Sequence, residues 1–404
     1  MIWNCVIIGA GAAGLYAASH LAIDQVLILE KKKKPALKLS VSGGGQCNLT
    51  HGGYASALLN HYGPHKTFVK PALKAHDNHA VMAYFNSLGV ELVTREDGKV
   101  FPKSLQSREI INALMHKITN ELAHHIKYDE PVGQVAFKDD LYEINTEKGT
   151  YLTKHLIVAT GGKSYPALGS EGDGYLFAEA LGIKVVPQFP GLAGVEIKKW
   201  PLQMLQGMSF QMVNCLHLAS GNTYKGDLLV THFGLSGPVI INNSRDFRPG
   251  DSLSINFLGI SREELTETFL TMAQESGHLP VRYFFNQLKI PDRFKQWVYD
   301  TYKIDHHQRL GEVSKDLRTE LVSVLTQYTI KIDKIQGYDQ AMVTVGGVAL
   351  EEIDRKKLCS KQYPGLYFIG EVLDVDGDTG GYNLQWAFSS GHAASCAIAI
   401  SSQR

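Results

Sequence analysis

Residues 4–14 read Asn-Cys-Val-Ile-Ile-Gly-Ala-Gly-Ala-Ala-Gly, and this stretch decides the fold. The apolar run Cys5–Ile8 is typical of a buried parallel strand. Gly9, Gly11 and Gly14 follow with the G-x-G-x-x-G spacing of a dinucleotide-binding turn. Gly9 allows a tight turn, Gly11 lets the backbone approach a pyrophosphate, and Gly14 lets the next helix pack on the strand. The stretch therefore predicts a Rossmann unit.

The residues that follow complete this unit. An alanine-rich helix is expected at Ala12–Ala22, and the backbone N–H groups of Ala12 and Ala13 at its start would face the phosphates. A second apolar strand, Val26–Leu29, ends at Glu30, where a carboxylate would bind an adenosine ribose hydroxyl. The combination predicts dinucleotide binding.

The residues after the second strand bear on the type of nucleotide. Glu30 disfavours a tightly bound NADP, because an acid repels a 2′-phosphate. The run Lys31–Lys34 is interpreted as a solvated turn, in which Lys31 at most contacts the adenosine end of the cofactor. The first glycine turn alone does not distinguish FAD from NAD.

A second glycine-rich segment near the C-terminus favours FAD. The strand-like run Leu366–Ile369 ends at Gly370 and Glu371, and this acid can reach ribityl hydroxyls. The turn Asp374–Gly381 then leads into Asn383 and Leu384 at the start of the last predicted helix. N–H donors at this helix start would face the N1–C2=O edge of a flavin and stabilise negative charge there.

Composition limits the class of protein. The chain has 404 residues, and its 40 basic residues balance 40 acidic ones, which gives no indication of a nucleic-acid partner or an anionic membrane. No apolar run reaches the roughly 18 residues that span a bilayer, and no signal peptide is recognised. The five cysteines contain no C-x-x-C pair, which is typical of a reducing cytoplasm. A small-molecule substrate is therefore expected, and the oligomeric state stays open.

The pattern of apolar segments predicts an α/β fold with an insertion. A cofactor domain is expected at residues 1–190 and 338–404. The insert, residues 191–337, is β-rich at 191–257 and 327–337 and helical at 261–326. Within the cofactor domain, 31–54 is expected to be a loop and Ser104–His125 one long amphipathic helix. The C-terminal part is expected to return to the N-terminal sheet.

Four sequence blocks carry a resemblance to a known family. They are Ser42-Gly-Gly-Gly-Gln-Cys-Asn48, Thr231-His-Phe-Gly-Leu-Ser-Gly-Pro238, Val343-Thr-Val-Gly-Gly-Val348 and the run Gly370–Leu384. In this order they resemble the BaiN/YhiN-like family of bacterial FAD-dependent oxidoreductases, which includes aminoacetone oxidase. The resemblance implies non-covalent FAD in a glutathione-reductase-like domain, with an inserted β-barrel-like subdomain and a helical subdomain.

The chain departs from the family pattern at two places. Ala36-Leu37-Lys38 stands where the family usually has Gly-Arg-Lys, and Gln46 stands where it usually has an arginine before the loop cysteine. The loss of this guanidinium removes a fixed charge near the cofactor or substrate. An anion-binding role of the family arginine is therefore not expected here.

The loop Ser42–Asn48 is assigned to FAD, because three consecutive glycines let backbone N–H groups hold an anion. Cys47 is interpreted as a small buried residue beside the cofactor, since no partner cysteine is near in the sequence. The whole predicted cofactor set is Gly9, Gly11, Ala12, Ala13, Gly14, Glu30, Lys31, Lys38, Ser42, Gly43, Gly44, Gly45, Cys47, Asn48, Val132, Ala159, Thr160, Gly161, Gly162, Gly370, Glu371, Asp374, Gly380, Gly381, Asn383 and Leu384.

No residue stands out as a catalytic acid or base. His232 is a candidate, within a turn that is expected to cap a helix beginning near Leu235. Histidine pairs without nearby carboxylates predict no metal site. No second G-x-G-x-x-G unit is found, so NAD(P)H, if used, would bind transiently.

These observations predict an FAD-dependent oxidoreductase that moves a hydride between a small organic substrate, or NAD(P)H, and the flavin. A reductase and an oxidase that uses O₂ both stay open. The alternative from a different class is a flavin-bound sensor or regulatory protein without turnover.

Overall fold

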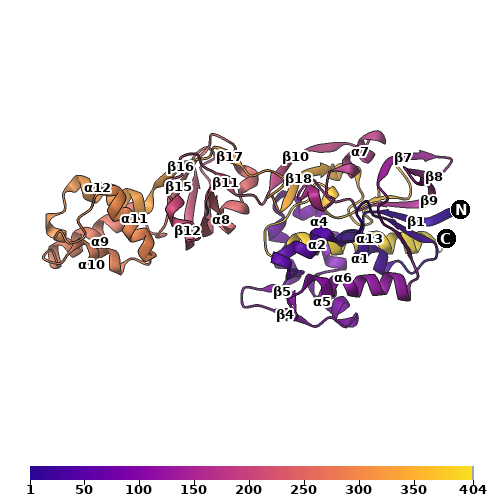
Figure 1. Cartoon of the computed structure of the whole chain (residues 1–404), viewed down its shortest axis with the longest axis horizontal. Coiled ribbons are helices and arrows are strands. Elements are labelled where there is room, and N and C mark those ends of the chain that lie inside the picture. The colour runs from indigo at the N-terminus through magenta and orange to yellow at the C-terminus, as the bar shows by residue number, and fades with distance from the viewer. Residues whose placement is uncertain (403–404) are drawn as a thin grey trace. The chain divides into compact units, whose positions relative to one another are not determined.

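The computed structural model describes residues 1–402 (Figure 1). It divides into two compact units, of which the first comprises Met1–Gly191 and the chain from Tyr338 onward. The second unit is Leu192–Gly337. Each unit has a hydrophobic core of its own. The observed division falls within one residue of the boundaries expected from the sequence.

The first unit is built on a largely parallel sheet with strand order β6-β2-β1-β9-β8-β7, and β19 pairs with β9. The strands are β1 (Ile2–Ile8), β2 (Val26–Leu29), β6 (His125–Lys127), β7 (Val132–Lys138), β8 (Leu141–Thr146), β9 (Gly149–Val158) and β19 (Leu366–Phe368). The central strands β1, β2 and β9 are apolar and buried at their carboxyl ends, as expected where helices cover both faces. This arrangement confirms the predicted Rossmann-type unit.

The C-terminal part returns to this unit as predicted. β19 adds to the sheet beside β9 in parallel register, with Leu366 opposite Leu156. The long helix α13 (Tyr382–Ser402) packs along α1 (Ala12–His20), and the two lie side by side (Figure 1). A Cβ on Gly391 would lie 2.9 Å from the Ala13 carbonyl oxygen, so a small residue is needed at this contact.

One returning strand does not join the main sheet. β18 (Val343–Val348) pairs antiparallel with β10 (Val185–Gly191) in a separate two-stranded sheet. The pairing brings the block Val343–Val348 next to the last segment before the insert.

The predicted helix Ser104–His125 is too long. The structure has α6 at Ser107–His116, followed by a wider helical turn at Lys117–Glu121. Ala123 adopts φ +53°, a left-handed conformation that ends the helix. His125 then begins β6, which pairs with β2. Sheet formation therefore overrides the helical pattern at its C-terminal end.

The segment predicted as a loop at residues 31–54 contains regular structure. It includes the helix α2 (Leu37–Val41), a 3₁₀ turn at Ser42–Gly45 and the short strand β3 (Thr50–His51). β3 extends the hairpin of β4 (Leu92–Thr94) and β5 (Lys99–Pro102).

Three further elements between residues 55 and 75 were not predicted. They are α3 (Ala55–Leu58), a 3₁₀ segment at Leu59–His65 and α4 (Lys66–Ala75), which precede α5 (Asn78–Ser87) and α7 (Asp173–Ala180) along the chain. α4 is amphipathic. It buries Val69, Ala72 and Leu73 and exposes three lysines on its other face.

The second unit combines a seven-stranded antiparallel sheet with a group of helices. The sheet order is β16-β15-β12-β13-β14-β11-β17. Its strands are β11 (Val195–Glu196), β12 (Ser209–His217), β13 (Thr223–Val230), β14 (Gly234–Ser236), β15 (Ser252–Asn256), β16 (Tyr328–Lys331) and β17 (Lys334–Ile335). The helices are α8 (Pro238–Ile241), α9 (Arg262–Glu275), α10 (Val281–Gln287), α11 (Asp292–Tyr302) and α12 (Lys315–Thr326).

The turn before α8 differs from its prediction. The predicted helix start near Leu235 is wrong, because Leu235 lies in β14, opposite Val195 and Val230. The helix begins instead at Pro238, whose fixed φ suits a first helical position.

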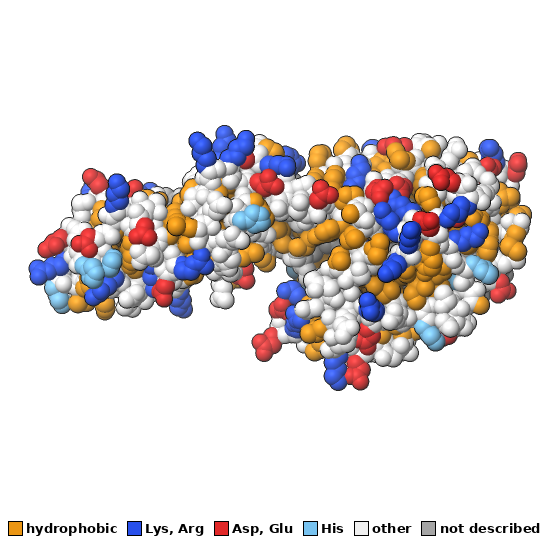
Figure 2. All heavy atoms as spheres, in the orientation of Figure 1, with side chains coloured by type: hydrophobic (Ala, Val, Ile, Leu, Met, Phe, Trp, Pro, Cys, Tyr) orange, Lys and Arg blue, Asp and Glu red, His pale blue; other side chains and the backbone are white. Residues whose placement is uncertain are grey.

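The chain carries 40 basic and 40 acidic residues. Figure 2 shows basic and acidic side chains interspersed over both units. Within residues 1–402, no helix is long and apolar enough to cross a membrane.

Candidate cofactor site

The glycine turn between β1 and α1 has the geometry that its sequence predicts. Gly9 has φ +104°, in the region that glycine favours. A Cβ on Gly14 would lie 2.0 Å from the Gly9 carbonyl oxygen, so close packing requires glycine there. A Cβ on Gly11 would meet no atom within 4 Å. The space over Gly11 is therefore open to a ligand.

Glu30 lies at the end of β2 and is 9 % exposed. Its Oε2 accepts a hydrogen bond from the Ala10 amide at 2.8 Å, and its Oε1 accepts one from the Lys32 amide at 2.8 Å. The carboxylate thus supports the glycine turn, a role that the sequence did not indicate. A carboxylate has about four acceptor sites, so these two hydrogen bonds leave room for the predicted one from a ribose hydroxyl.

A pocket lies beside the glycine turn, where the adenosine end of a dinucleotide is expected. Its lining is Ile8, Gly9, Gly11, Leu29, Glu30, Lys31, Glu130, Val132, Ala159, Thr160, Leu168, Gly169, Ser170, Asp173 and Phe177. Lys31 pairs with Asp173 at 2.7 Å and with Glu171 at 3.2 Å. Its ammonium is therefore neutralised by protein carboxylates at the edge of this pocket.

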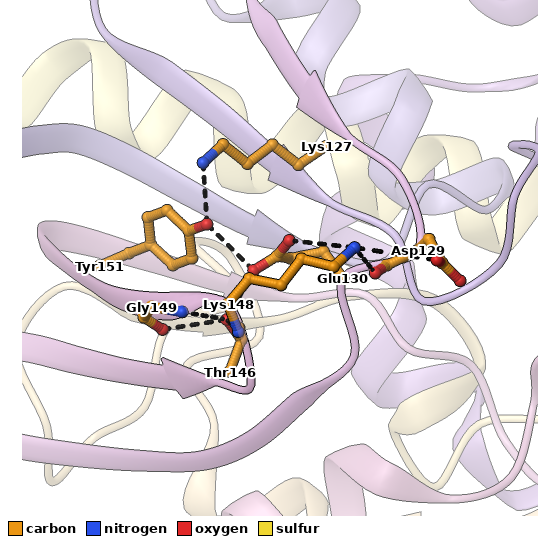
Figure 3. Close-up of polar contacts among 7 residues, drawn as sticks. All are labelled: Lys127, Asp129, Glu130, Thr146, Lys148, Gly149 and Tyr151. Carbon is orange, nitrogen blue, oxygen red and sulfur yellow. Dashed lines mark hydrogen bonds and ion pairs between the residues drawn. The ribbon is translucent and has the colours of Figure 1, made fainter.

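A polar network around Glu130 fixes one wall of the pocket (Figure 3). Glu130 is 3 % exposed, and its Oε1 accepts hydrogen bonds from Tyr151 at 3.0 Å and Thr146 at 2.5 Å. Lys127 donates to the Tyr151 hydroxyl at 2.9 Å, and Lys148 lies 3.7 Å from Glu130 Oε2. Lys148 also donates to the Asp129 carbonyl. The network secures the crossing from β6 to β7, where Val132 lies; the sequence did not indicate it.

The loop Ser42–Asn48 turns through consecutive left-handed residues. Gly43, Gly44 and Gly45 have φ of +56°, +69° and +86°. Such a run turns successive backbone N–H groups toward one side, which suits an anion. Cys47 is fully buried, and burial raises the pKa of its thiol to about 12. The thiol is therefore protonated at neutral pH, and the place of Cys47 beside the cofactor stays a prediction.

The acid that follows β19 is engaged with protein groups. Glu371 Oε2 pairs with Lys38 Nζ at 2.7 Å, and Oε1 accepts a hydrogen bond from the Thr344 amide at 2.8 Å. A Cβ on Gly162 would lie 2.3 Å from the Thr344 hydroxyl, so the glycine stop after β9 packs against β18. Lys38 and Glu371, both predicted cofactor residues, thus form one ion pair, and contact of either with a cofactor stays a prediction.

The turn before α13 packs against β3. Gly380 and Gly381 have φ of +122° and +100°, and a Cβ on Gly381 would lie 2.6 Å from the Thr50 backbone. The side chain of Asn383 accepts a hydrogen bond from the Gly377 amide at 2.8 Å and donates to the Gly377 carbonyl at 2.9 Å. The turn is therefore fixed before the helix begins. Its expected contact with a flavin stays a prediction.

A group of histidines, an aromatic ring and acids surrounds this turn. The Tyr382 ring is stacked with His51, at a centroid distance of 5.3 Å, and with His61, at 4.0 Å. His61 Nδ1 lies 2.9 Å from Asp378 Oδ2. His65 Nε2 lies 3.6 Å from the buried carboxylate of Asp376. The sequence did not indicate these pairs.

The remaining predicted residues are placed as follows. His232 lies in the second unit, exposed in the turn between β13 and β14, with its ring edge against Phe233. Its role as an acid or base stays a prediction. Asp374 faces His65 and Asp376, and burial raises the pKa of its carboxyl. All predicted cofactor residues belong to the first unit. No group of metal-ligating side chains occurs within residues 1–402.

Unpaired polar atoms test whether these residues fit a cofactor. The Thr160 hydroxyl, the Asn48 side-chain oxygen and the Tyr175 hydroxyl are buried and have no hydrogen-bond partner among the described residues. Such groups are costly unless a ligand or water satisfies them. Thr160 follows β9 and lines the pocket beside Gly11, Asn48 ends the left-handed loop, and Tyr175 lies in α7. The residues fit an extended dinucleotide such as FAD.

Three comparisons place the chain among known proteins. The family model described as "HI0933-like protein Rossmann domain" matches residues 3–397. The chain is 32 % identical over 405 residues to the ribosomal RNA dihydrouridine synthase of Escherichia coli, covering 97 % of this chain and 96 % of that protein. It is 28 % identical over 408 residues to the 3-dehydro-bile acid delta(4,6)-reductase of Clostridium scindens, covering 97 % and 98 %.

A solved structure agrees in fold. The 3-ketosteroid-delta4-(5alpha)-dehydrogenase of Rhodococcus jostii RHA1 superposes with a TM-score of 0.51 at 14 % identity, covering 97 % of this chain and 96 % of that one. At this identity the likeness concerns the fold alone.

Proposed function

The chain belongs to the HI0933-like family, and we propose on that basis that it reduces a carbon–carbon double bond conjugated to a carbonyl group, with uridine in RNA as its first candidate substrate. The family and its relatives make the chain an FAD-dependent oxidoreductase, as predicted, and give no support to a sensor role.

FAD, when bound, supplies the two-electron chemistry of this reaction. The chain supplies the binding groups: the glycine turn and the left-handed loop for phosphates, Glu30 for a ribose, and the buried Thr160, Asn48 and Tyr175 as hydrogen-bonding groups without protein partners. We propose NAD(P)H as the electron donor. It would bind transiently, because the sequence offers no second Rossmann unit to retain it. A cytoplasmic location stays a prediction.

The relative with 32 % identity supports RNA as the substrate class. Dihydrouridine differs from uridine by two hydrogens added across one ring double bond, which is the reaction class proposed above. The expectation of no nucleic-acid partner rested on the balanced charge of the whole chain, and this balance does not describe local surfaces. The proposal therefore departs from that expectation.

A local basic surface supports the same substrate class. Lys66, Lys70 and Lys74 lie one helical turn apart on the exposed face of α4. None of them has an ion-pair partner among the described residues. α4 directly follows His65, which pairs with Asp376 beside the C-terminal turn. The basic row thus starts next to the cluster of histidines and acids, where RNA phosphates could bind.

A small conjugated ketone is the second candidate substrate. The relative with 28 % identity is named for a 3-dehydro-bile acid, and its coverage of 97 % of this chain supports this alternative. Both candidates require the same two-hydrogen reduction, so the proposed reaction does not depend on the choice between them.

Product analysis tests the proposal. Purified holoprotein is incubated without oxygen with NADH or NADPH and either ribosomal RNA transcribed in vitro, which lacks modified nucleosides, or a 3-ketosteroid with conjugated double bonds. Nucleosides and steroids are then analysed by mass spectrometry. We expect dihydrouridine in the RNA; steroid reduction alone would favour the second candidate. A protein that oxidises NAD(P)H but reduces neither substrate would contradict the proposed reaction.

A further inference from the structure

His51 and His61 both stack on the ring of Tyr382, but their hydrogen bonds differ. Both ring nitrogens of His51 face backbone carbonyls, Nδ1 at 2.9 Å from Gly52 and Nε2 at 3.0 Å from Asp97. His61 uses only Nδ1, which lies 2.9 Å from Asp378 Oδ2. Its Nε2 has no hydrogen-bond partner within the described part of the chain, and its side chain is 38 % exposed. His61 is therefore the one of the two that can exchange a proton.

Residue 378 fixes both the ring and the backbone of His61. The Asp378 amide donates to the His61 carbonyl at 2.9 Å, while the Asp378 carboxylate binds His61 Nδ1. A carboxylate at one ring nitrogen sets the tautomer and the orientation of a histidine and leaves the other nitrogen for proton transfer. The stacked Tyr382 ring limits rotation of the imidazole from its face. His61 is thus oriented from two sides.

The position of this pair links it to the cofactor. Asp378 belongs to the turn that opens α13, and Tyr382 is the first residue of that helix. The sequence predicts that the N1–C2=O edge of the flavin lies at this helix start. His61, Asp378 and Tyr382 all belong to the first unit, which also contains the predicted cofactor residues.

We propose that His61 donates the proton in the reduction of the substrate double bond and that Asp378 is its positioning residue; this inference rests on the proposed function. Bound FAD would supply a hydride to one carbon of the double bond, and the π electrons would form the second C–H bond with the proton from His61 Nε2 at the other carbon. The His61 N–H bond breaks, and the imidazolium becomes a neutral ring that keeps its Nδ1 proton toward Asp378. The exposed side of the ring regains a proton from water.

His65 is the alternative donor in this cluster. Its Nε2 faces Asp376 at 3.6 Å, and its side chain is only 14 % exposed. The nitrogen that would donate is therefore directed at a buried carboxylate. The geometry favours His61.

Matched variants test the proposal in the FAD-loaded protein. His61→Gln, His51→Gln and Asp378→Asn are compared for FAD affinity, for anaerobic bleaching of the flavin band by NAD(P)H, and for dihydrouridine formation in ribosomal RNA. General acid catalysis contributes about 10²–10⁴-fold. We expect His61→Gln to slow product formation by at least about 100-fold with unchanged FAD affinity and bleaching. His51→Gln, which leaves the His61–Asp378 pair in place, should slow product formation far less than His61→Gln.

Two further readouts separate proton donation from a structural role. Added imidazole should restore part of the rate of His61→Ala, as it replaces the missing donor. Nitrogen-15 NMR of the histidine rings should show the Nδ1–H tautomer for neutral His61 in the parent protein and a mixture of tautomers in Asp378→Asn. Absence of imidazole rescue, together with a tautomer that does not respond to Asp378→Asn, would overturn the assignment.

The outcomes distinguish this inference from the proposed function. If the parent protein forms dihydrouridine or the reduced steroid and His61→Gln forms it equally fast, the reaction stands and the proton donor is another group. If the parent protein forms neither product, the proposed function fails, and the assignment of His61 fails with it.

Discussion

Glu30 and Ala10 are joined by a hydrogen bond of 2.8 Å that ties the end of β2 to the glycine turn after β1. The same carboxylate accepts the Lys32 amide through its other oxygen. The acid that the sequence assigns to the ribose therefore also holds the glycine turn in place. Loss of this side chain is expected to affect both parts of the nucleotide site.

The first prediction concerns this carboxylate. Glu30→Ala should weaken FAD binding by about 1.5–3 kcal/mol, the range for hydrogen bonds to a charged group. Titration of the apoprotein with FAD measures the effect. Glu147→Ala, an exposed glutamate in the turn between β8 and β9, is the control with the same change in charge. Equal FAD affinity of the Glu30 variant and this control would remove Glu30 from the site.

The second prediction separates the two roles of glycine in the turn. Gly14→Ala should lower the melting temperature of the apoprotein, because its Cβ would lie 2.0 Å from the Gly9 carbonyl oxygen. Gly11→Ala should leave the apoprotein melting temperature unchanged, since its Cβ meets no atom within 4 Å, but should weaken FAD binding. Thermal unfolding with and without FAD measures both. Full FAD affinity in Gly11→Ala would mean that no phosphate approaches this position.

Much of the fold follows from local sequence. The run of apolar residues before Gly9, the glycine spacing and Glu30 predict β1, α1 and β2, since each feature acts within one strand–turn–helix unit. The return of β19 also follows, because a short apolar run before Gly370 suits a buried parallel strand. The end of α6 at His116 could not be predicted in this way, because it depends on the pairing of His125 with β2, which is distant in the sequence.

The candidate site shows the same limit. The pairing of His61 with Asp378 joins residues 317 positions apart, and no local pattern reports such a contact. The compact segment at residues 55–75, which carries His61 and α4, was not predicted, because Gly63 and Pro64 interrupt its helical pattern. Most of the predicted cofactor residues lie in or beside glycine-rich turns, and such turns can be recognised from a few consecutive residues.

The third prediction concerns the basic face of α4. Replacement of Lys66, Lys70 and Lys74 by Glu should weaken RNA binding and reduce the slope of log affinity against log salt by about 0.7 for each phosphate that no longer has a lysine beside it. Filter binding of ribosomal RNA at several salt concentrations measures this slope. The control replaces three exposed lysines of the second unit, Lys289, Lys303 and Lys315, with Glu and has the same net charge. Equal slopes in the two variants would contradict a specific role of α4.

The fourth prediction concerns stability at acidic pH. Burial lowers the pKa of His20 to about 4 and that of His76 to about 3. The unfolded chain takes up these protons near the ordinary pKa of 6.5, whereas the folded chain resists them. The free energy of unfolding should therefore decrease as the pH falls below 6.5, down to about pH 4 for His20 and about pH 3 for His76.

Melting temperatures measured between pH 6.5 and pH 3 test the predicted loss of stability. His20→Phe keeps a ring against Tyr84, where the centroids are 4.1 Å apart, and should flatten the loss of stability on acidification. His79→Gln, which replaces an exposed histidine of α5, should leave the pH dependence unchanged. The same pH dependence in His20→Phe as in the parent protein would mean that His20 does not contribute to it.

The most direct measurement follows the flavin absorbance without oxygen. The purified protein is reduced with one equivalent of NADPH or NADH, and ribosomal RNA transcribed in vitro is then added. We expect the flavin band to return while dihydrouridine forms in equal amount, because the RNA accepts the hydride and a proton. A band that stays bleached after the addition of RNA and of the conjugated 3-ketosteroid, and returns only when air is admitted, would contradict the proposed reductase and indicate an oxidase.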